Sequence, residues 1–119
     1  MISFLGFIQI YRITKEWFPH PIIAILLCII GTTIIVKNRK KIIGYAIITG
    51  NYLHYLAVSS RYHGKGYGKK LFEKILPSIK KLRVNVKNKK AISLYESHGF
   101  KIIGTSNWIT GKKYIMMLE

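Results

Sequence analysis

The sequence predicts an α+β (mixed α/β) fold in which one sheet is flanked by helices. A glycine-rich turn at 63–68 joins an apolar, strand-like segment to a segment with apolar residues at helical spacing. Two β-rich runs flank a short polar turn at 38–39, which is typical of a hairpin. Alternating and helical patterns then follow one another toward the C-terminus, as in strands and helices packed in layers. The length of 119 residues indicates a single domain, 1–119.

The first half of the chain contains four predicted elements. Residues 7–14 are expected to form a strand, because isoleucines there have polar neighbours between them. Two prolines then break the pattern, and residues 20–30 are expected to form a buried helix. The hairpin strands are expected at 32–37 and 42–49, where β-branched residues are frequent.

The segment 17–36 also permits a different interpretation. It contains no formally charged residue and is long enough to span a bilayer, so a membrane-anchored protein is an alternative. Prolines near its start and the Gly31-Thr32-Thr33 interruption favour a helix and a strand instead. In that case four side chains of the helix should pack under the sheet of a water-soluble protein: Ile22, Ile25, Leu26 and Ile29.

The N-terminal segment and the cysteine content bear on the compartment. The N-terminus has no basic region of the kind that opens a secretion signal. The single cysteine, Cys28, cannot form an internal disulfide and lies in an apolar run, as core cysteines do. A cytoplasmic location is therefore expected.

The second half of the chain supplies a strand, a helix, a strand, a helix and two closing strands. These elements are expected at 52–58, from the glycine turn to Pro77, and at 82–86, 88–98, 100–104 and 114–118, with a loop or turn around 107–112. The complete expected order is β-α-βββ-α-β-α-ββ.

The charge of the chain limits its possible partners. Twenty basic residues face four acidic ones, which gives a formal net charge of +16. Such a chain should attract polyanions, including nucleic acid, anionic membranes and phosphorylated cofactors, and should repel polyamines. Most of the basic residues are lysines, whereas base-specific recognition uses arginine, asparagine or glutamine, so sequence-specific DNA binding is not indicated. A lysine-rich composition that serves only solubility is the alternative.

The glycine-rich turn has the features of an anion-binding site. Gly64, Gly66 and Gly68 permit positive φ and close approach of a ligand to the main chain. The N–H groups of the turn and of the first helical turn are free to bind an anion, and the helix dipole adds positive charge. Three lysines lie in the same stretch. The turn therefore predicts a phosphate or pyrophosphate ligand, with a flexible lysine-rich loop as the alternative.

Two motifs resemble the GNAT (Gcn5-related) N-acetyltransferases. Residues 63–68, HGKGYG after Leu56-Ala57-Val58, are similar to that family's R/Q-x-x-G-x-G/A element. Residues 88–100 are similar to its pattern of an asparagine followed by A-I-x-L-Y-E-x-x-G-F. The resemblance implies a sheet splayed between the third strand, 52–58, and the fourth, with acetyl-coenzyme A in the split. The first 30 residues match only loosely, and the acceptor-shaping region is short.

The resemblance also implies which residues hold the cofactor. The backbone of 56–58 would pair with the pantetheine arm and hydrogen-bond the thioester carbonyl. The turn would cradle the pyrophosphate, with His63 in place of the usual Arg or Gln and hence with weaker binding. Asn88 would contact the pantetheine arm. The implied cofactor-binding residues are Leu56, Ala57, Val58, His63, Gly64, Lys65, Gly66, Tyr67, Gly68, Lys69 and Asn88.

Two side chains occupy the positions of the family's acid and base. Tyr95 would protonate the departing thiolate, unless it is only one more aromatic residue of a core helix face. His54 replaces the glutamate of many members and could accept a proton through water, unless it is only a strand-face residue. The family fold would bring both to the same side of the split. No metal site is expected, because His20 and His98 have no partners at ligand spacing.

The function implied is acetyl transfer from acetyl-coenzyme A to a primary amine by direct attack. The amine could belong to a protein N-terminus, a lysine or a small molecule, and the net charge suits an acceptor that is acidic or held on RNA. Two alternatives remain beside it. One is a catalytically degenerate module of the same fold that binds coenzyme A or nucleic acid, and the other is a protein anchored to a membrane through 17–36.

Overall fold

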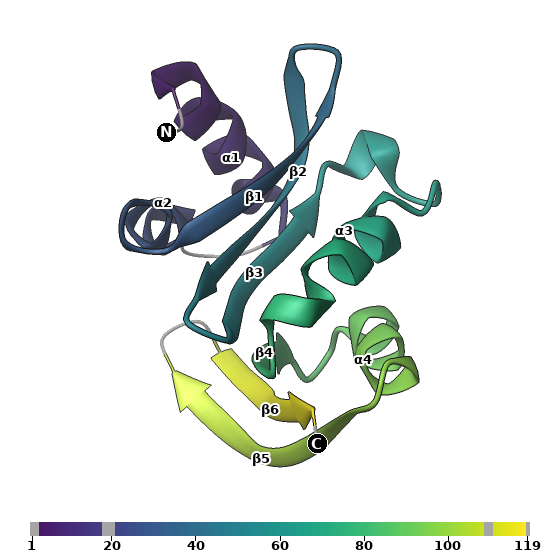
Figure 1. Ribbon diagram of the computed structural model, residues 1–119. Helices are drawn as coiled ribbons and strands as arrows, with labels where there is room; N and C mark the ends of the chain where they lie inside the picture. Colours follow the sequence, from purple (N-terminus) through teal and green to yellow (C-terminus); the bar gives the residue numbers. More distant parts are fainter. Residues whose placement is uncertain (1–2, 18–20, 109–110, 119) are drawn as a thin grey trace.

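A computed structural model describes residues 3–17, 21–108 and 111–118 of the chain. It contains four helices and six strands in these described ranges (Figure 1). In chain order they are α1 (Phe4–Trp17), α2 (Pro21–Ile30), β1 (Thr32–Asn38), β2 (Lys41–Thr49), β3 (Tyr52–Val58), α3 (Tyr67–Ile75), β4 (Lys81–Asn85), α4 (Lys89–Ser97), β5 (Phe100–Trp108) and β6 (Gly111–Leu118). Two short 3₁₀ turns, Ser60–Tyr62 and Leu76–Ser78, flank α3.

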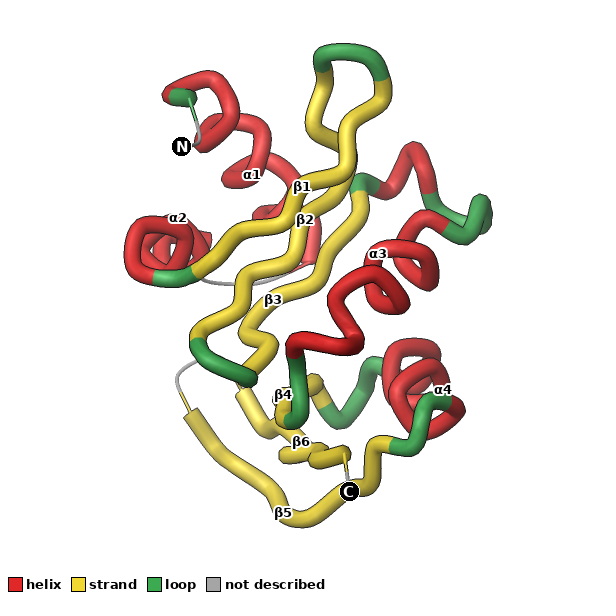
Figure 2. The backbone as a smooth tube through the Cα atoms, viewed as in Figure 1, coloured by secondary structure: helices red, strands yellow, loops and turns green. Residues whose placement is uncertain are grey.

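The strands form one mixed sheet, which confirms the predicted fold class. Their order is β1-β2-β3-β4-β6-β5, and every neighbouring pair is antiparallel except β3 and β4, which are parallel. Helices α1 and α2 cover one face of the sheet, and α3 and α4 cover the other (Figures 1 and 2). Helix α3 is the crossover that a parallel pair of strands requires.

The sheet is split between its two parallel strands. Only two residue pairs join β3 to β4, Tyr52 with Lys81 and Leu53 with Leu82. Beyond these pairs the strands diverge, so that no described strand pairs with the rest of β3 on that edge (Figure 2). The resemblance predicted a sheet splayed between these two strands, and the pairing confirms it.

A β-bulge lies at the point where the split opens. On β2, Ile47 and Ile48 are adjacent, whereas their partners on β3, Tyr55 and Leu53, are two residues apart, so His54 is the extra residue. A bulge of this kind interrupts the alternation of side chains between the two faces. Leu53 is therefore buried under α3 and α4, whereas both His54 and Tyr55 lie on the α2 side.

Two hydrophobic clusters form the core, one on each face of the sheet. The first packs α3 and α4 against strands on both sides of the split, with Phe72, Leu82 and Met116 inaccessible to solvent. The second packs α1 and α2 against β2 and β3, with Ile10 and Tyr45 at its centre. The α3–α4 face is thus closed by a continuous core, whereas the second cluster does not extend to β4, β5 or β6.

The predicted strand at 7–14 is wrong, because these residues belong to α1. The buried residues are Gly6, Ile10, Ile13 and Thr14, spaced as one face of a helix rather than alternately. The side chain of Ser3 accepts a hydrogen bond from the Gly6 N–H at 3.1 Å and so caps the first turn. Ser3, directly before the first apolar residue of the segment, was the local signal for the start of this helix.

A buried hydroxyl pair fastens α1 to the sheet. The Thr14 hydroxyl lies 2.7 Å from the Ile10 carbonyl and is also hydrogen-bonded to the Tyr45 hydroxyl of β2, both side chains being fully buried. We expect Thr14→Val to lower the free energy of unfolding by about 1–3 kcal/mol, because it strands the Tyr45 hydroxyl without a partner. Urea denaturation measures this, with Thr14→Ser as the control that keeps the hydroxyl. Equal stability of both variants and wild type would contradict the role of this pair.

The predicted burial of α2 is wrong for three of its four residues. Ile22, Leu26 and Ile29 are 60%, 57% and 67% exposed. The side that packs on the sheet is instead that of Ala24 and Cys28, with Ile25 and Leu27 partly buried beside them. Every position of α2 is apolar, so periodicity could not tell which side faces inward.

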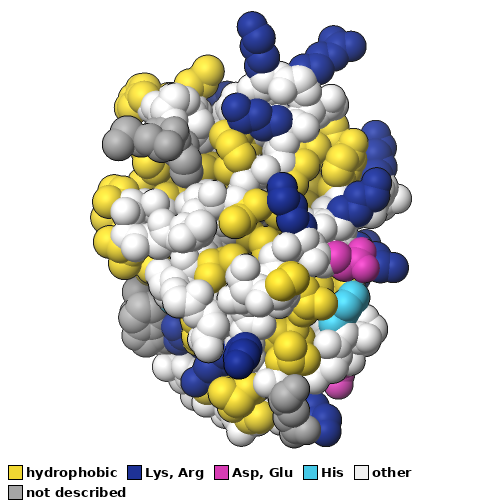
Figure 3. Space-filling view, in the orientation of Figure 1, with side chains coloured by type: hydrophobic (Ala, Val, Ile, Leu, Met, Phe, Trp, Pro, Cys, Tyr) yellow, Lys and Arg dark blue, Asp and Glu magenta, His cyan; other side chains and the backbone are white. Residues whose placement is uncertain are grey.

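Exposed apolar side chains also occur at the start of α1, at Phe4 and Leu5. Figure 3 shows yellow, hydrophobic side chains along the side of the molecule where α1 and α2 lie. Within the described ranges, no helix is both long and apolar enough to cross a bilayer. The segment 17–36 is divided between the end of α1, a ten-residue α2 and β1, with 18–20 outside the described residues.

The remaining predicted elements are confirmed, with longer strands at the C-terminus. Strand β5 continues to Trp108 and β6 begins at Gly111, so the expected loop around 107–112 is replaced by strand except at 109–110, which lie outside the described residues. Polar residues such as Ser106 and Asn107 pair there with Lys113 and Lys112. Antiparallel main-chain pairing extends beyond the apolar part of these strands, which the sequence pattern does not show.

Candidate active site at the split of the sheet

The glycine turn connects the end of β3 to α3 as the sequence predicted. Gly64 and Gly66 have φ values of 76° and 82°, and no atom lies within 4 Å of the place where a Cβ would stand. The first hydrogen bond of α3 runs from the Lys70 N–H to the Gly66 carbonyl at 3.0 Å. The N–H groups of residues 66–69 therefore precede the helical bonding pattern and remain available at the positive end of the helix dipole. This geometry suits a phosphate or pyrophosphate.

His63, the first residue of the predicted turn motif, faces away from that anion site. Its Nε2 lies 2.8 Å from the carbonyl oxygen of Val58, and its ring stacks on Trp17 with centroids 4.6 Å apart. The Trp17 indole N–H donates to the same carbonyl at 3.0 Å. The side chain of His63 thus joins α1 to the end of β3, which leaves anion binding to the main chain and to lysines.

Basic side chains surround the start of α3. Lys65 lies over the ring of Tyr62, with Nζ 5.7 Å from the centroid, and Tyr62 meets Tyr67 edge-on at 5.9 Å. Lys69 and Lys70 are exposed in the first turn of the helix. Figure 3 shows dark blue Lys and Arg side chains along this edge and at the β1–β2 hairpin. The turn therefore lies in a positive field that attracts phosphorylated ligands.

The free edge of β3 presents main-chain groups to the split. The Ser59 N–H donates to the Ile43 carbonyl of β2 at 2.7 Å, which sets the alternation of hydrogen-bonding directions along β3. Ala57 therefore turns its N–H and carbonyl to β2, whereas Leu56 and Val58 turn theirs to the split. Of the three residues expected to bind the pantetheine arm, Ala57 offers it no main-chain group. The Val58 carbonyl already accepts from Trp17 and His63.

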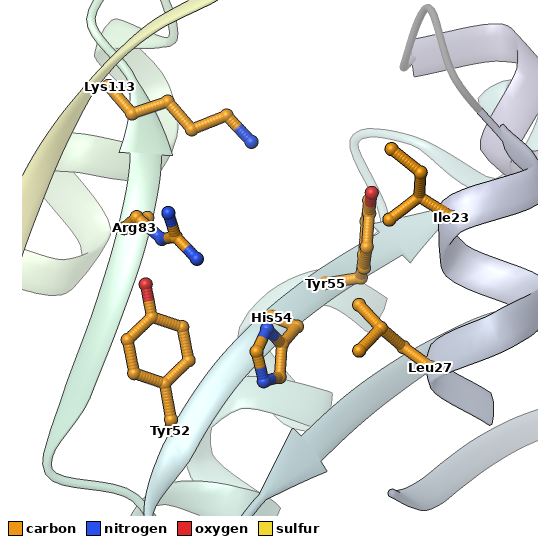
Figure 4. Close-up of a pocket in the computed structure, with 7 residues that line it drawn as sticks. All are labelled: Ile23, Leu27, Tyr52, His54, Tyr55, Arg83 and Lys113. Atoms are coloured by element: carbon orange, nitrogen blue, oxygen red, sulfur yellow. The ribbon is translucent and has the colours of Figure 1, made fainter. Parts of the chain in front are cut away.

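A small cavity opens into the split on the α2 side, between β3 and β4 (Figure 4). It has a volume of about 30 Å³. Its lining combines two aliphatic side chains of α2 with three side chains of β3 and two cations of the neighbouring half-sheet: Ile23, Leu27, Tyr52, His54, Tyr55, Arg83 and Lys113.

His54 lies in this cavity, and contacts with Thr49 and Tyr52 hold its ring in place. Its Nε2 is hydrogen-bonded to the Thr49 hydroxyl, and its ring packs against that of Tyr52 with centroids 4.6 Å apart. Burial lowers the pKa of His54 below its ordinary value of 6.5, and the positive charges of Arg83 and Lys113 lower it further. The imidazole is therefore neutral at physiological pH, the form that can accept a proton.

The other titratable groups of the cavity respond to the same surroundings. Burial raises the pKa values of Tyr52 and Tyr55, and Arg83 opposes this rise in each. Burial also lowers the pKa of Lys113, and repulsion from Arg83 adds to the effect. Arg83 is therefore the charge that influences every titrating side chain of the cavity.

Tyr95 lies elsewhere, in the core between α4 and α3. Its ring packs against Phe72 at 5.0 Å and Phe100 at 6.4 Å, and burial raises its pKa to about 12. The phenol is thus protonated at neutral pH. Tyr95 belongs to the cluster on the α3–α4 face, whereas His54 opens to the α2 face. The expectation that both lie on the same side of the split is therefore wrong.

The last predicted binding residue, Asn88, has a structural contact. Its side-chain oxygen accepts a hydrogen bond from the Ala91 N–H at 3.2 Å, which makes it the N-cap of α4. His98, at the other end of α4, lies 3.7 Å from the Glu73 carboxylate, whereas His20 is outside the described residues. No cluster of three potential metal ligands occurs in the part of the chain that the structure describes.

The match to a family model extends over most of this architecture. The model describes an acetyltransferase (GNAT) domain and covers residues 30–102, from the last residue of α2 into β5. The chain belongs to the GNAT acetyltransferase family. The matched region includes both strands of the split and the glycine turn, but Lys113 and nearly all of α1 and α2 lie outside it.

Two curated relatives match part of this GNAT protein. They are the peptidyl-lysine N-acetyltransferases YjaB of Salmonella typhimurium and Escherichia coli, 32% and 30% identical over 73 residues. Each match covers 60% of the chain and 50% of the relative. The chain therefore spans about half the length of the curated relatives that it matches.

Solved structures resemble the GNAT protein over nearly its whole length. The ribosomal-protein-S18-alanine N-acetyltransferase of Escherichia coli superposes with a TM-score of 0.78 and 21% identity, covering 98% of this chain and 88% of that one. Arabidopsis thaliana Naa50, in complex with the bisubstrate analogue CoA-Ac-MVNAL, superposes with a TM-score of 0.74 and 19% identity, covering 99% and 95%. At these identities the likeness shows the fold, including the first 30 residues.

The structure adds three residues to the site of this GNAT protein that the sequence did not indicate. Trp17 fastens α1 to the end of β3, and Arg83 and Lys113 place two positive charges in the cavity. Arg83 stands between two buried apolar residues of β4, and this was the only local signal. Lys113 carried none, because lysines occur throughout the chain.

Proposed function

We propose that this GNAT protein transfers the acetyl group of acetyl-coenzyme A to a primary amine. The observation that carries the proposal is the split between β3 and β4, with the anion-binding turn at the end of β3. The split offers an extended ligand the free edge of a strand, and the turn offers its pyrophosphate a set of N–H groups at a helix N-terminus. A cytoplasmic location, consistent with the free thiol of Cys28, is part of the proposal.

The residues at the split fit the coenzyme. The space over Gly64 and Gly66 is open, and a Cβ at either position would meet nothing within 4 Å, so a phosphate can approach the main chain. The coenzyme supplies a thioester whose carbonyl carbon is open to attack by an amine. The N–H groups of Leu56 and Val58, which face the split, are the donors proposed to stabilise the oxygen that gains charge during that attack.

The acceptor amine must be neutral when it attacks. His54 is proposed to accept its proton, directly or through one water, because the imidazole is neutral and faces the cavity. The Thr49 hydroxyl behind Nε2 holds the ring in orientation. Tyr95, across the sheet, is proposed to reach the thiolate from the opposite face of the split.

The pH profile tests the role of His54. If His54 is the base, kcat/KM should fall at low pH as His54 becomes protonated. We expect this acidic limb of the profile below pH 6.5, because burial and the charges of Arg83 and Lys113 lower the pKa of His54. Arg83→Gln should move the limb to higher pH, since it removes a charge that opposes protonation. His54→Gln should abolish it, while the acceptor amine's own limb stays the same in all three proteins. Identical profiles in wild type and His54→Gln would leave His54 as a structural residue of the bulge.

The acceptor is proposed to be an amine of a protein or of a small molecule. The curated relatives are named as peptidyl-lysine N-acetyltransferases. One enzyme of similar structure is named as the ribosomal-protein-S18-alanine N-acetyltransferase. A lysine side chain and a protein N-terminus are therefore the first candidates. Polyamines are not expected, because the chain carries a net charge of +16.

An acceptor screen tests the proposed function. Purified protein is mixed with acetyl-coenzyme A and a panel of free-N-terminus peptides, lysine peptides and small amines, and the release of free thiol is followed. Mass spectrometry should show one added acetyl group on the accepted amine. Acetyl-coenzyme A binding without turnover on any acceptor would instead favour the binding module of the same fold.

A further inference from the structure

We propose that the amine accepted by this protein carries a carboxylate close by, and that Arg83 and Lys113 bind this carboxylate. The inference rests on the proposed acetyl transfer and specifies its acceptor class. The carboxylate could belong to a free amino acid or to an acidic residue next to a peptide N-terminus. The chemistry that recognises it is the same in both cases.

The two cations lie where an acceptor must enter the split. Arg83 follows Leu82, the last residue of β4 that pairs with β3, and His54 follows Leu53, the last residue of β3 that pairs with β4. Lys113 is opposite Asn85 on β6, and so lies diagonally across from Arg83 on the same face. Both side chains extend into the cavity that contains His54 (Figure 4). An anion held there lies beside the proposed base.

The charges in the cavity are of one sign. Of the lining residues that the structure describes, two are cations, one is a histidine and none is a carboxylate. Burial and Arg83 both lower the pKa of Lys113, so the site disfavours its own positive charge. A bound carboxylate would reverse this effect by stabilising both cations.

The walls of the cavity favour a planar anion. Arg83 and Lys113 form its cationic wall. The Arg83 guanidinium lies against the Tyr52 ring, 5.3 Å from its centroid. This contact restrains the guanidinium plane, and a restrained guanidinium is suited to bidentate binding of a carboxylate. Ile23 and Leu27 close the opposite wall.

Matched acceptors test the inference directly. Peptides with a free N-terminus that differ only in Glu or Gln at the second position form one pair, and alanine with alaninamide forms the other. At about pH 8, where the imidazole is neutral, we expect kcat/KM to favour the carboxylate member of one pair by about tenfold or more. The pair that responds identifies the source. If the two members of each pair had equal kcat/KM values, this inference alone would be overturned. If no acceptor were turned over at all, the proposed function would be overturned.

Variants assign the preference to the two residues. Arg83→Gln and Lys113→Met should each raise KM for the acidic acceptor with little change for its neutral partner. Lys113→Glu should shift preference toward a peptide with lysine at the second position. The control is Lys112→Met, which removes an equal charge from the next, exposed residue and should keep the preference. Unchanged melting temperatures, with and without acetyl-coenzyme A, establish folding. Equal losses on acidic and neutral acceptors would overturn the assignment.

Discussion

Gly66→Glu should abolish the rise in melting temperature that acetyl-coenzyme A gives the wild-type protein. A ligand at about 100 times its Kd stabilises a protein by about 2.7 kcal/mol, which thermal unfolding detects readily. Gly66 is the N-cap of α3 with φ of 82°, and its surroundings are open. A glutamate there places bulk and negative charge where the pyrophosphate would bind, opposed to the helix dipole that favours the anion.

The control for this variant is Gly50→Glu. Gly50 also has positive φ, 59°, with nothing within 4 Å of its Cβ position, but it lies in the β2–β3 turn. Both substitutions should therefore lower the free energy of unfolding by a similar amount, about 1–2 kcal/mol, because each forces a residue with a Cβ into left-handed backbone. Only Gly66→Glu should lose the ligand response. A wild-type protein that shows no response at millimolar ligand would contradict the cofactor assignment itself.

Tyr95→Phe should lower kcat on the order of 10²-fold, the usual scale of a lost general acid. The variant keeps the ring and its packing on Phe72 and Phe100 but removes the hydroxyl. Because the phenol has a pKa of about 12, it is protonated at the pH of the assay and can donate. The proposed proton donation takes place only when the thiolate departs, so the affinity for acetyl-coenzyme A should change little.

Tyr114→Phe is the matched control, since Tyr114 packs against the same core cluster from β6. It should leave kcat near the wild-type value, which separates loss of a proton donor from loss of a core hydroxyl. Thiol release under saturating substrates measures kcat, and thermal shift measures coenzyme binding. Full activity of Tyr95→Phe would leave main-chain stabilisation of the oxyanion and proximity as the source of rate.

Local signals explain why the centre of the fold could be predicted. The boundaries of β3 are those expected, and α3 ends at Ile75, where the 3₁₀ turn Leu76–Ser78 that contains Pro77 begins. Glycine and proline act through the backbone of their own few residues, so their effect is visible in a short window. The asparagine at 88 and the glycine at 99 likewise mark the ends of α4, and Gly99 has the positive φ of a C-terminal cap.

Interactions between distant segments explain the failures. The isoleucines of 7–14 fit an alternating pattern in part, and only their packing on β2 shows that Ile10 and Ile13 share a helix face. The bulge at His54 depends on the register of β2 against β3 and leaves no trace in composition. Likewise, Arg83 and Lys113 become a pair only through the pairing of β4 with β6.

The two residue pairs between β3 and β4 can act as a hinge between two half-sheets, β1-β2-β3 and β4-β6-β5. A core shared by both half-sheets seals the α3–α4 face, and only the cavity separates the half-sheets on the α2 face. Opening would thus be a rotation about the sealed side. Amide hydrogen exchange would follow it, because the N–H groups of Leu56 and Val58 face no neighbouring strand, whereas that of Ala57 pairs with β2. Those two amides should exchange faster than Ala57 in the free protein and slow when a ligand occupies the edge.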